Sequence, residues 1–445
     1  MKKAFVCHVV LFFIFLMYVS SAFSEQLSFS YVWNQISAES PAQKSAEFQT
    51  QAASAAKDRA GRHWLPTVYM DAAGYGTNDP GSAFFGLLEQ RSLKQSDFNP
   101  DSINHPGDNI YMRGALGIDM PLYEGGMRST QVKIQEHALA AAENESSQIR
   151  LEEYSQAGLS FVSIAILAKQ KKKLEDLNVE IEKFMKNYQL GQKSNPVGYS
   201  GLLGMKSLSN RISGFLSQYN AQMLSHYFML REMGVNNNEW LPDISDAVQF
   251  AENYLMQETE SSGSYRQASL QEIAFAGAEA GKIEKAKSLP RLGAFAESYV
   301  FNGDRDTANG YTAGLYLKWN IFDPSSYRTF EEAGLKAAAA KKSSEAYARQ
   351  ERAQRSGLQE SVKALKDNIA IINESDKILL EQIEVMKTLF KNGAVSALQL
   401  IEVLNRRVDL IAQQNEAELA FVKSSAQAVT LEKFDIQKRI EGIKD

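Results

Sequence analysis

The sequence predicts a mainly α-helical fold with four β-strands, assembled from two copies of one structural unit. Residues 60–66 (AGRHWLP) end an alanine-rich helical stretch and precede a strand-like segment, and residues 286–290 (AKSLP) do the same about half a chain later. In each half two segments of alternating polarity follow, and after them comes a long, charged, proline-free stretch. A duplication of this length indicates two copies of one unit.

Residues 1–24 are predicted to be a secretory signal peptide. Lys2 and Lys3 precede an apolar run, and Ser-Ala-Phe-Ser at residues 21–24 supplies the small residues of a cleavage site. A transmembrane anchor is the alternative, but the run is short for crossing a bilayer. Cys7 precedes the apolar run, so it does not fit lipid attachment, and cleavage leaves no thiol. Loss of the two lysines takes the formal charge from −5 to −7, which argues against a nucleic-acid partner.

The first repeat is predicted over residues 25–235. A helix is expected at about 29–62, and strands at about 67–76 and 109–122. The residues between the strands are rich in Gly, Pro, Asn and Asp, and they predict a large exposed loop. One face of the second strand is apolar, because the residues at even positions are Ile110, Met112, Leu116, Ile118, Met120 and Leu122.

The second repeat is predicted over residues 265–435, with strands at about 291–302 and 310–322 and a shorter loop between them. A water-soluble sandwich would give the same alternation, but four strands cannot close a barrel alone and the rest of the chain is helical. Residues 236–264 form a connector whose amphipathic part, about 244–256, is expected to pack across the outside of the helices. The charged tail, 436–445, is expected to be loose.

Each repeat is expected to end in a helical hairpin, at about 127–233 and about 325–433. The first arm of each hairpin lacks proline and would reach about 90–100 Å. Apolar residues in these arms step by three and four, which predicts antiparallel coiled-coil packing. The two seams match at an offset of 202 residues: Leu167, Gln170, Leu174, Leu177, Ile181, Phe184 and Tyr188 correspond to Ile369, Ile372, Asp376, Leu379, Ile383, Met386 and Phe390.

No residue pattern indicates catalysis. His63, His105, His137 and His226 lack metal-ligand spacing, and residues 201–204 lack the lysine of a phosphate-binding loop. The many carboxylates lie on charged helices, where a solvated face is the simpler interpretation. We therefore expect no enzyme activity, no bound metal and no cofactor.

Three segments resemble the TolC-type outer-membrane efflux proteins, the outer membrane factors. Residues 288–292 (SLPRL) enter a strand, residues 121–126 (PLYEGG) leave one, and residues 390–396 (FKNGAVS) precede Leu400 and Leu404. The signal peptide, the tandem halves and the hairpins extend the resemblance over nearly all of the chain after residue 24.

The resemblance implies a homotrimer in the outer membrane of a Gram-negative-type cell. Each subunit would give four strands to one twelve-stranded β-barrel in the lipid and its helices to one periplasmic α-helical tunnel. The resulting water-filled duct would be passive. It would receive substrates from an inner-membrane transporter through a periplasmic adaptor, in efflux or in type I secretion. No nucleic acid is implied.

The resemblance also implies two kinds of site at the periplasmic tips. Gln399 and Glu402 occupy the positions of a pore constriction, where only Glu402 is acidic and a ring of three carboxylates would favour cations. The alternative for Glu402 is an ordinary exposed helix carboxylate. Pro196 departs from the family pattern at the first tip. The implied adaptor contacts, for which helix capping alone is the alternative, are Gly191, Ser194, Gly393 and Ser396.

A secreted coiled-coil scaffold or adhesin stalk is the alternative function. It is disfavoured because Ile118, Met120 and Trp319 would then face water. The sequence does not indicate the cargo or whether the pump is driven by ATP or by protons.

Overall fold

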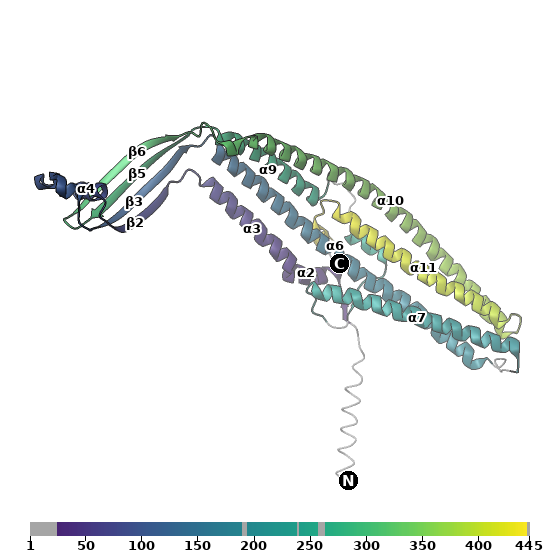
Figure 1. Ribbon diagram of the computed structural model, residues 1–445. Helices are drawn as coiled ribbons and strands as arrows, with labels where there is room; N and C mark the ends of the chain where they lie inside the picture. The colour runs from purple at the N-terminus through teal and green to yellow at the C-terminus, as the bar shows by residue number, and fades with distance from the viewer. Residues whose placement is uncertain (1–24, 189–193, 238–239, 257–262, 443–445) are drawn as a thin grey trace, which may run out of the picture. The chain divides into compact units, whose positions relative to one another are not determined.

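The structure is a computed structural model that describes residues 25–188, 194–237, 240–256 and 263–442. The predicted signal peptide, Gly191 and the last residues of the tail lie outside this description. Within these ranges the fold is mainly α-helical with a few strands (Figure 1). None of the described helices combines the length and the apolar character that crossing a bilayer requires.

Proline and capping residues set the helix boundaries. The helix expected at 29–62 is divided, because α2 (Phe29–Glu39) ends before Pro41 and α3 (Pro41–Gly61) begins on it. A proline fits the first helical position, where its missing N–H is not needed. The other helices that form the two repeats are α6 (Met127–Asn187), α7 (Pro196–Glu232), α9 (Tyr265–Lys287), α10 (Thr329–Lys391) and α11 (Ala397–Thr430).

Four long strands form one antiparallel sheet in the order β2-β3-β5-β6. β2 (Thr67–Thr77), β3 (Asn109–Tyr123) and β5 (Arg291–Asn302) lie within a residue of the expected bounds. The expectation for the last strand is wrong, because β6 spans Thr307–Lys318 instead of 310–322. Lys318 pairs with Arg291, the first residue of β5, and the preceding Pro290 has no N–H with which to extend the ladder.

The chain divides into two compact units that do not follow the repeats, since each unit draws on both of them. The helical unit comprises the described residues within 25–48, 144–268 and 346–442. The sheet unit comprises Gln49–Glu143 and Ser269–Glu345.

One face of the sheet carries exposed apolar residues. In the register, Met70 lies opposite Leu116, and the neighbouring Ile118 lies opposite Ala296 on the same face. The side chain of Leu116 is 59% exposed, and that of Met70 is 80% exposed. On the other face Tyr111 and Ala115 are buried. A water-soluble sheet shows the reverse arrangement.

Four aromatic rings on this second face lie over glycines of the neighbouring strand. Each ring belongs to the direct cross-strand partner of the glycine, and a Cβ at the glycine would contact or overlap it. Glycine is therefore required for the close approach of ring and backbone. The pairs are Tyr69 with Gly117, Tyr316 with Gly293, Tyr299 with Gly310, and Phe295 with Gly314.

The segment between β2 and β3 is not the irregular loop that its composition predicted. It contains α4 (Pro80–Glu89), a 3₁₀ turn η1 (Gln95–Phe98) and α5 (Pro100–Asn104). Asp79 caps α4 by accepting a hydrogen bond from the N–H of Ser82 at 2.8 Å. We call residues 78–108 the outer segment.

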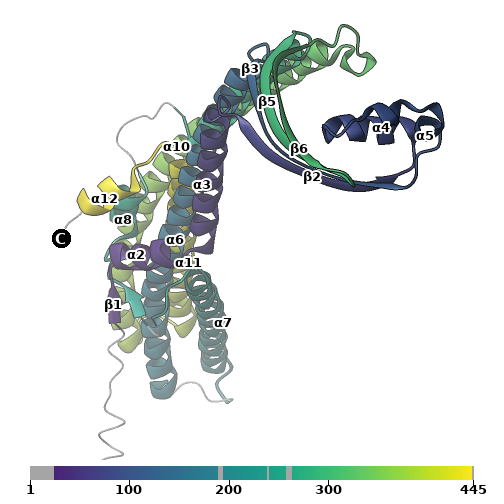
Figure 2. The same cartoon turned by 90° about the vertical axis from the view of Figure 1, so that its left-hand side faces the viewer.

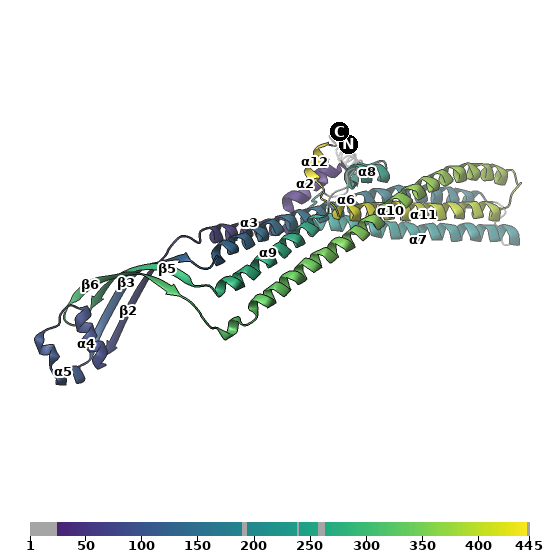
Figure 3. The ribbon, with the colours of Figure 1, turned by 90° about the horizontal axis from the view of Figure 1, so that it is seen from above.

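The helical unit contains an apolar core along the expected seams. Leu167, Leu174, Leu177 and Ile181 of α6 share one buried cluster with Ile383 of α10. Residues of α7 and α11 complete the same cluster, and these two helices lie side by side (Figure 3).

A second core lies around the connector. Its short helix α8 (Ala247–Tyr254) packs on α11, and Phe250 stacks on Phe161 of α6 with ring centroids 5.7 Å apart. Short strands β1 (Glu25–Leu27) and β4 (Trp240–Pro242) pair in parallel beside it. The expectation of a loose tail is wrong for α12 (Ile436–Gly442), because Ile436 is buried and Arg439 donates to the backbone oxygen of Met256. In Figure 3 α2, α8 and α12 gather on one side of the helices.

Candidate functional site: the inner sheet face and the helical tips

The face of the sheet opposite the exposed apolar residues, which we call the inner face, carries a polar network. Arg113 of β3 forms ion pairs with Glu297 of β5 and with Asp71 of β2, the latter at 3.8 Å. Tyr69 donates a hydrogen bond to Glu297 at 3.1 Å, and Tyr316 donates one to Asp119 at the same distance. These residues come from all four strands, so the face is held together by polar contacts while the apolar residues lie on the opposite face.

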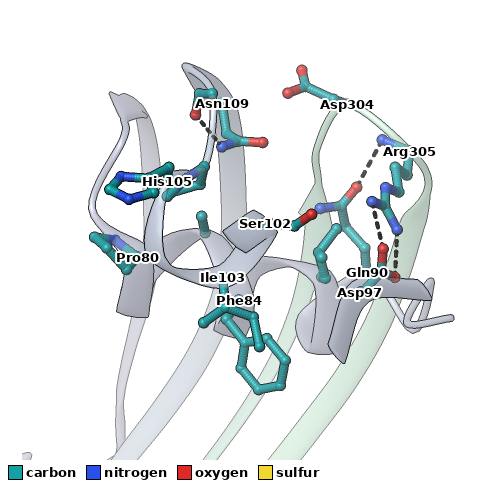
Figure 4. A pocket seen from close by; sticks show the side chains of 14 residues that line it. Pro80, Phe84, Gln90, Asp97, Ser102, Ile103, His105, Asn109, Asp304 and Arg305 are labelled. Carbon is teal, nitrogen blue, oxygen red and sulfur yellow. Dashed lines mark hydrogen bonds and ion pairs between the residues drawn. The ribbon is translucent and has the colours of Figure 1, made fainter. Parts of the chain in front are cut away.

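The outer segment packs against one end of this inner face. Tyr111 donates a hydrogen bond to the backbone oxygen of Ala83 at 3.2 Å, and its ring lies against Gly86 of α4. The ring of Phe301 packs beside Tyr111 in a tilted arrangement, with ring centroids 5.4 Å apart. Between the outer segment and the β5–β6 turn lies a cavity of about 310 Å³ (Figure 4).

One ion pair at this cavity joins the outer segment to the β5–β6 turn. The guanidinium of Arg305 donates to both carboxylate oxygens of Asp97, at 2.7 and 2.9 Å (Figure 4). These hydrogen bonds lower the pKa of Asp97 to about 2, with a further contribution from the backbone N–H of Lys94. Asp97 therefore stays ionised at any physiological pH.

The second helical tip is built by capping residues that include three of the predicted site residues. Gly393 has φ +71°, and its N–H donates to Phe390 O at 3.0 Å while Ala394 N–H donates to Leu389 O at 2.9 Å. This pair of bonds ends α10 with the left-handed residue expected of a tip glycine. Ser396 and Gln399 then bond reciprocally, side chain to backbone N–H, to start α11.

The predicted constriction residues differ in their contacts. The Gln399 side chain is engaged in the cap, where its Oε1 accepts from Ser396 N–H at 2.8 Å. Glu402 is exposed and accepts a hydrogen bond from Arg406, one turn along α11, at 2.6 Å. The two side chains therefore have separate local partners within the subunit.

The first tip is described only in part. Gly191 lies outside the described residues, and Ser194 is exposed. Pro196, which departs from the family pattern, occupies the first turn of α7 behind the cap Asn195, whose side chain accepts from Gly198 N–H at 3.1 Å. The departure thus creates a regular helix start.

A groove of about 1010 Å³ lies between the two tips of the helical unit. Its lining includes the rings of Tyr188 and Phe390, which are tilted relative to one another with their centroids 5.9 Å apart. Lys387 bridges Glu180 of α6 and Glu384 of its own helix. The hydrogen bond from Lys387 lowers the pKa of Glu384. Gly393 and Ser396 also line this groove.

Sequence reasoning missed a buried polar layer between the helices. Lys173 of α6 donates to Asp376 of α10 at 3.2 Å and to Gln414 of α11 at 2.6 Å. Gln170 donates to the buried Glu418 at 3.1 Å. The signal was present, because Gln170 and Asp376 are the polar members of two otherwise apolar seams, but neither partner on α11 follows from the spacing.

Among the described residues, no three His, Cys, Asp or Glu side chains gather where they could hold a metal ion. His137 contacts Glu272 at 2.7 Å, and burial lowers the pKa of His226. His226 Nδ1 lies 3.4 Å from the hydroxyl oxygen of Ser160.

Comparison with known proteins gives similarity of structure without similarity of sequence. No protein-family model and no curated protein matches the sequence. Among solved structures, the CusC transmembrane channel is similar with a TM-score of 0.74, 10% identity and coverage of 92% of this chain and 93% of that chain. The CmeC outer membrane channel of Campylobacter jejuni is similar with a TM-score of 0.74, 12% identity and coverage of 93% and 88%.

A third structure, the outer membrane protein VceC of Vibrio cholerae, is similar with a TM-score of 0.72, 13% identity and coverage of 91% and 97%. Each similarity extends over nearly the whole of both chains.

Proposed function

We propose, from the premise that this chain has the fold of the TolC-type outer-membrane channels, that three copies form a channel-tunnel in the outer membrane of a Gram-negative-type cell. The resemblance in its sequence indicated the same fold. Their strands close one twelve-stranded barrel, and their helices form a periplasmic tunnel. The single observation that carries the proposal is the inverted sheet, apolar outside and ion-paired inside.

The two edges of the sheet support closure by further copies. In the described sheet β2 pairs only with β3, and β6 pairs only with β5. All neighbours are antiparallel, so β6 of one copy can pair with β2 of the next in the same sense. A ring of three copies leaves no exposed edge, which is the condition for strands in lipid.

A second apolar seam on α10 supports packing between copies of the helices. Ile371, Ile378 and Val385 repeat at seven-residue spacing, and all three are more than half exposed. The buried seam residue Ile383 lies on a different face of the same helix. A helix with two apolar stripes has one for its own subunit and one for a neighbour.

The tips are the proposed contact with the pump assembly. The groove lined by Tyr188, Phe390 and Ser396 would receive the helical hairpin of a periplasmic adaptor, which joins the duct to an inner-membrane transporter. Gly191 and Ser194 are proposed as contacts from the first tip. The duct itself is passive, with neither catalysis nor cofactor, and it serves efflux or type I secretion.

Glu402 is the proposed constriction residue. Three copies around one axis would form a ring of carboxylates, and Arg406 beside each one would partly offset their repulsion. Gln399 contributes through its cap, which fixes the start of α11 and thereby the position of Glu402.

A secreted scaffold or adhesin stalk remains the second candidate, and the exposed apolar face of the sheet counts against it. The test is extraction of the mature protein from membranes. A channel requires detergent and migrates on gels as a trimer that heating dissociates, whereas a scaffold dissolves freely in buffer. A soluble monomer would overturn the channel.

The constriction is tested separately by conductance in planar bilayers. Glu402→Gln should reduce cation preference, and Glu416→Gln is the matched control, because Glu416 is an exposed glutamate farther along the same helix. Unchanged selectivity in Glu402→Gln would remove this residue from the constriction and leave the channel standing.

A further inference from the structure

The two repeats differ most at one end of the sheet. There the β5–β6 connection is only residues 303–306, whereas the outer segment that joins β2 to β3 contains α4, η1 and α5. Both connections lie at the same end, because Met112 near the start of β3 pairs with Asn302 at the end of β5. A tight turn suffices to join two antiparallel strands, so the additional helices need another explanation.

The outer segment folds over the polar face of the sheet and not over the apolar face. Tyr111, against which α4 packs, is only 1% exposed, while its neighbours Ile110 and Met112 on the opposite face remain exposed. Figure 2 shows α4 and α5 on the concave side of the curved sheet.

Two side chains fasten the segment to the β5–β6 turn. Oε1 of the buried Gln90 accepts hydrogen bonds from the N–H of Arg305 at 2.9 Å and from the N–H of Asp306 at 3.0 Å. A Cβ at Gly303 would overlap the Gln90 side chain. Together with the bidentate Arg305–Asp97 pair, these bonds hold the end of α4 and the turn η1 against the β5–β6 turn.

The segment presents apolar side chains away from the sheet. Phe85 of α4 is 63% exposed, and Leu88 and Phe98 are also exposed. If the polar face lines the duct, these side chains project into its outer end. An apolar constriction of this kind narrows the water-filled path and restricts what passes by size.

We propose that the outer segment is a size-selecting constriction at the outer end of the duct, held across the lumen by Gln90 and Arg305. The proposal rests on the proposed channel, since it requires the polar face to be the lumen. It assigns Phe85, Leu88 and Phe98 as the residues that limit the cargo, and it places the limit in this chain and not in the pump.

The experiment compares trimers in planar bilayers. Replacing residues 80–106 by a short Asn-Gly turn should raise single-channel conductance by about twofold or more, because the narrowest outer part is removed. It should also raise the size of the polyethylene glycol that can enter from the outer side. A second variant keeps the helices but removes their contacts with the β5–β6 turn. This variant, Gln90→Ala combined with Arg305→Ala, should shift the polymer limit in the same direction.

Gln95→Ala is the matched control, because Gln95 is an exposed glutamine of the same segment. It should leave conductance and polymer limit unchanged. Wild-type conductance in both the turn replacement and the double variant would overturn the constriction alone, with the channel intact. A wild-type protein that forms no conducting trimer would overturn the channel, and this inference with it.

Discussion

The sheet unit and the helical unit place the same kinds of residue on opposite sides. In the sheet, Leu116 faces outward while Arg113 and Glu297 pair on the inner face. In the helical unit, Leu177 and Ile383 lie in the core while charged pairs such as Lys172–Asp176 lie at the surface. One chain therefore follows two opposite rules of burial.

Under the proposed function, the difference follows from the medium that each unit meets. Burial of apolar side chains is favourable because water surrounds the protein, and lipid removes that preference. In lipid the backbone N–H and C=O groups need partners instead, and the antiparallel ladder of the sheet supplies them. The helical unit follows the rule for water, and in the proposed trimer its exposed seam at Ile371, Ile378 and Val385 would contact a neighbouring copy.

The largest expected effect comes from a charge on the outer face of the sheet. Leu116→Arg should abolish assembly, because an arginine near the middle of a lipid-facing strand costs about 2–4 kcal/mol in each copy. The measurement is the fraction of protein recovered as a heat-dissociable trimer in the outer membrane.

Thr312→Arg is the control for this charge. Thr312 pairs with Glu297 on the inner face, where a positive charge finds a carboxylate, so the trimer should form. Equal assembly of the two variants would show that both faces meet water, and the comparison between the units would fail.

A smaller effect is expected from shortening side chains on α10. Ile383→Ala should destabilise the helical unit by about 2–5 kcal/mol, because the residue is fully buried and its removal leaves a cavity. Ile378→Ala removes the same atoms from a residue that is 61% exposed, so the subunit should keep its stability while the trimer dissociates at lower urea. Urea titrations followed by circular dichroism and by gel migration separate the two. Equal loss of subunit stability would place Ile378 in the core.

The strands and long helices could be predicted because their signals are local. Alternation at Ile110 to Leu122 and steps of three and four at Leu167 to Tyr188 depend only on neighbouring residues. The end of β6 was predicted too far along because the alternation continues to Ile321, whereas the strand ends where its partner β5 begins. A strand needs a partner, and its sequence alone does not contain one.

The parts of the candidate site that could be predicted are those formed by residues close together in the sequence. Capping at Gly393 and Ser396 follows from residues within one turn, and the structure has the expected conformation at Gly393. The helix start at Asp79-Pro80 was a local signal that went unused, since the Gly- and Pro-rich composition favoured a loop. The polar layer around Lys173 and the Gln90–Arg305 contact join distant parts of the chain, so no spacing rule reveals them.

The smallest effect is expected at the ion pair between Asp97 of the outer segment and Arg305 of the β5–β6 turn. The folded pKa of Asp97 is lowered to about 2 from its ordinary value of 3.8, first by the hydrogen bonds from Arg305. A lowered carboxyl pKa contributes stability above the ordinary value and loses it only as the pH falls through the folded value. The outer segment should therefore stay fastened from about pH 8 to about pH 4.

A fluorescent label at Phe85→Cys, the only thiol once the predicted signal peptide is removed, reports the position of the outer segment through quenching from the outer side. Asp97→Asn should raise the quenching equally at every pH in this range, because Arg305 loses its charged partner. A wild-type label whose quenching rises near pH 5 would mean that a group other than Asp97 holds the segment.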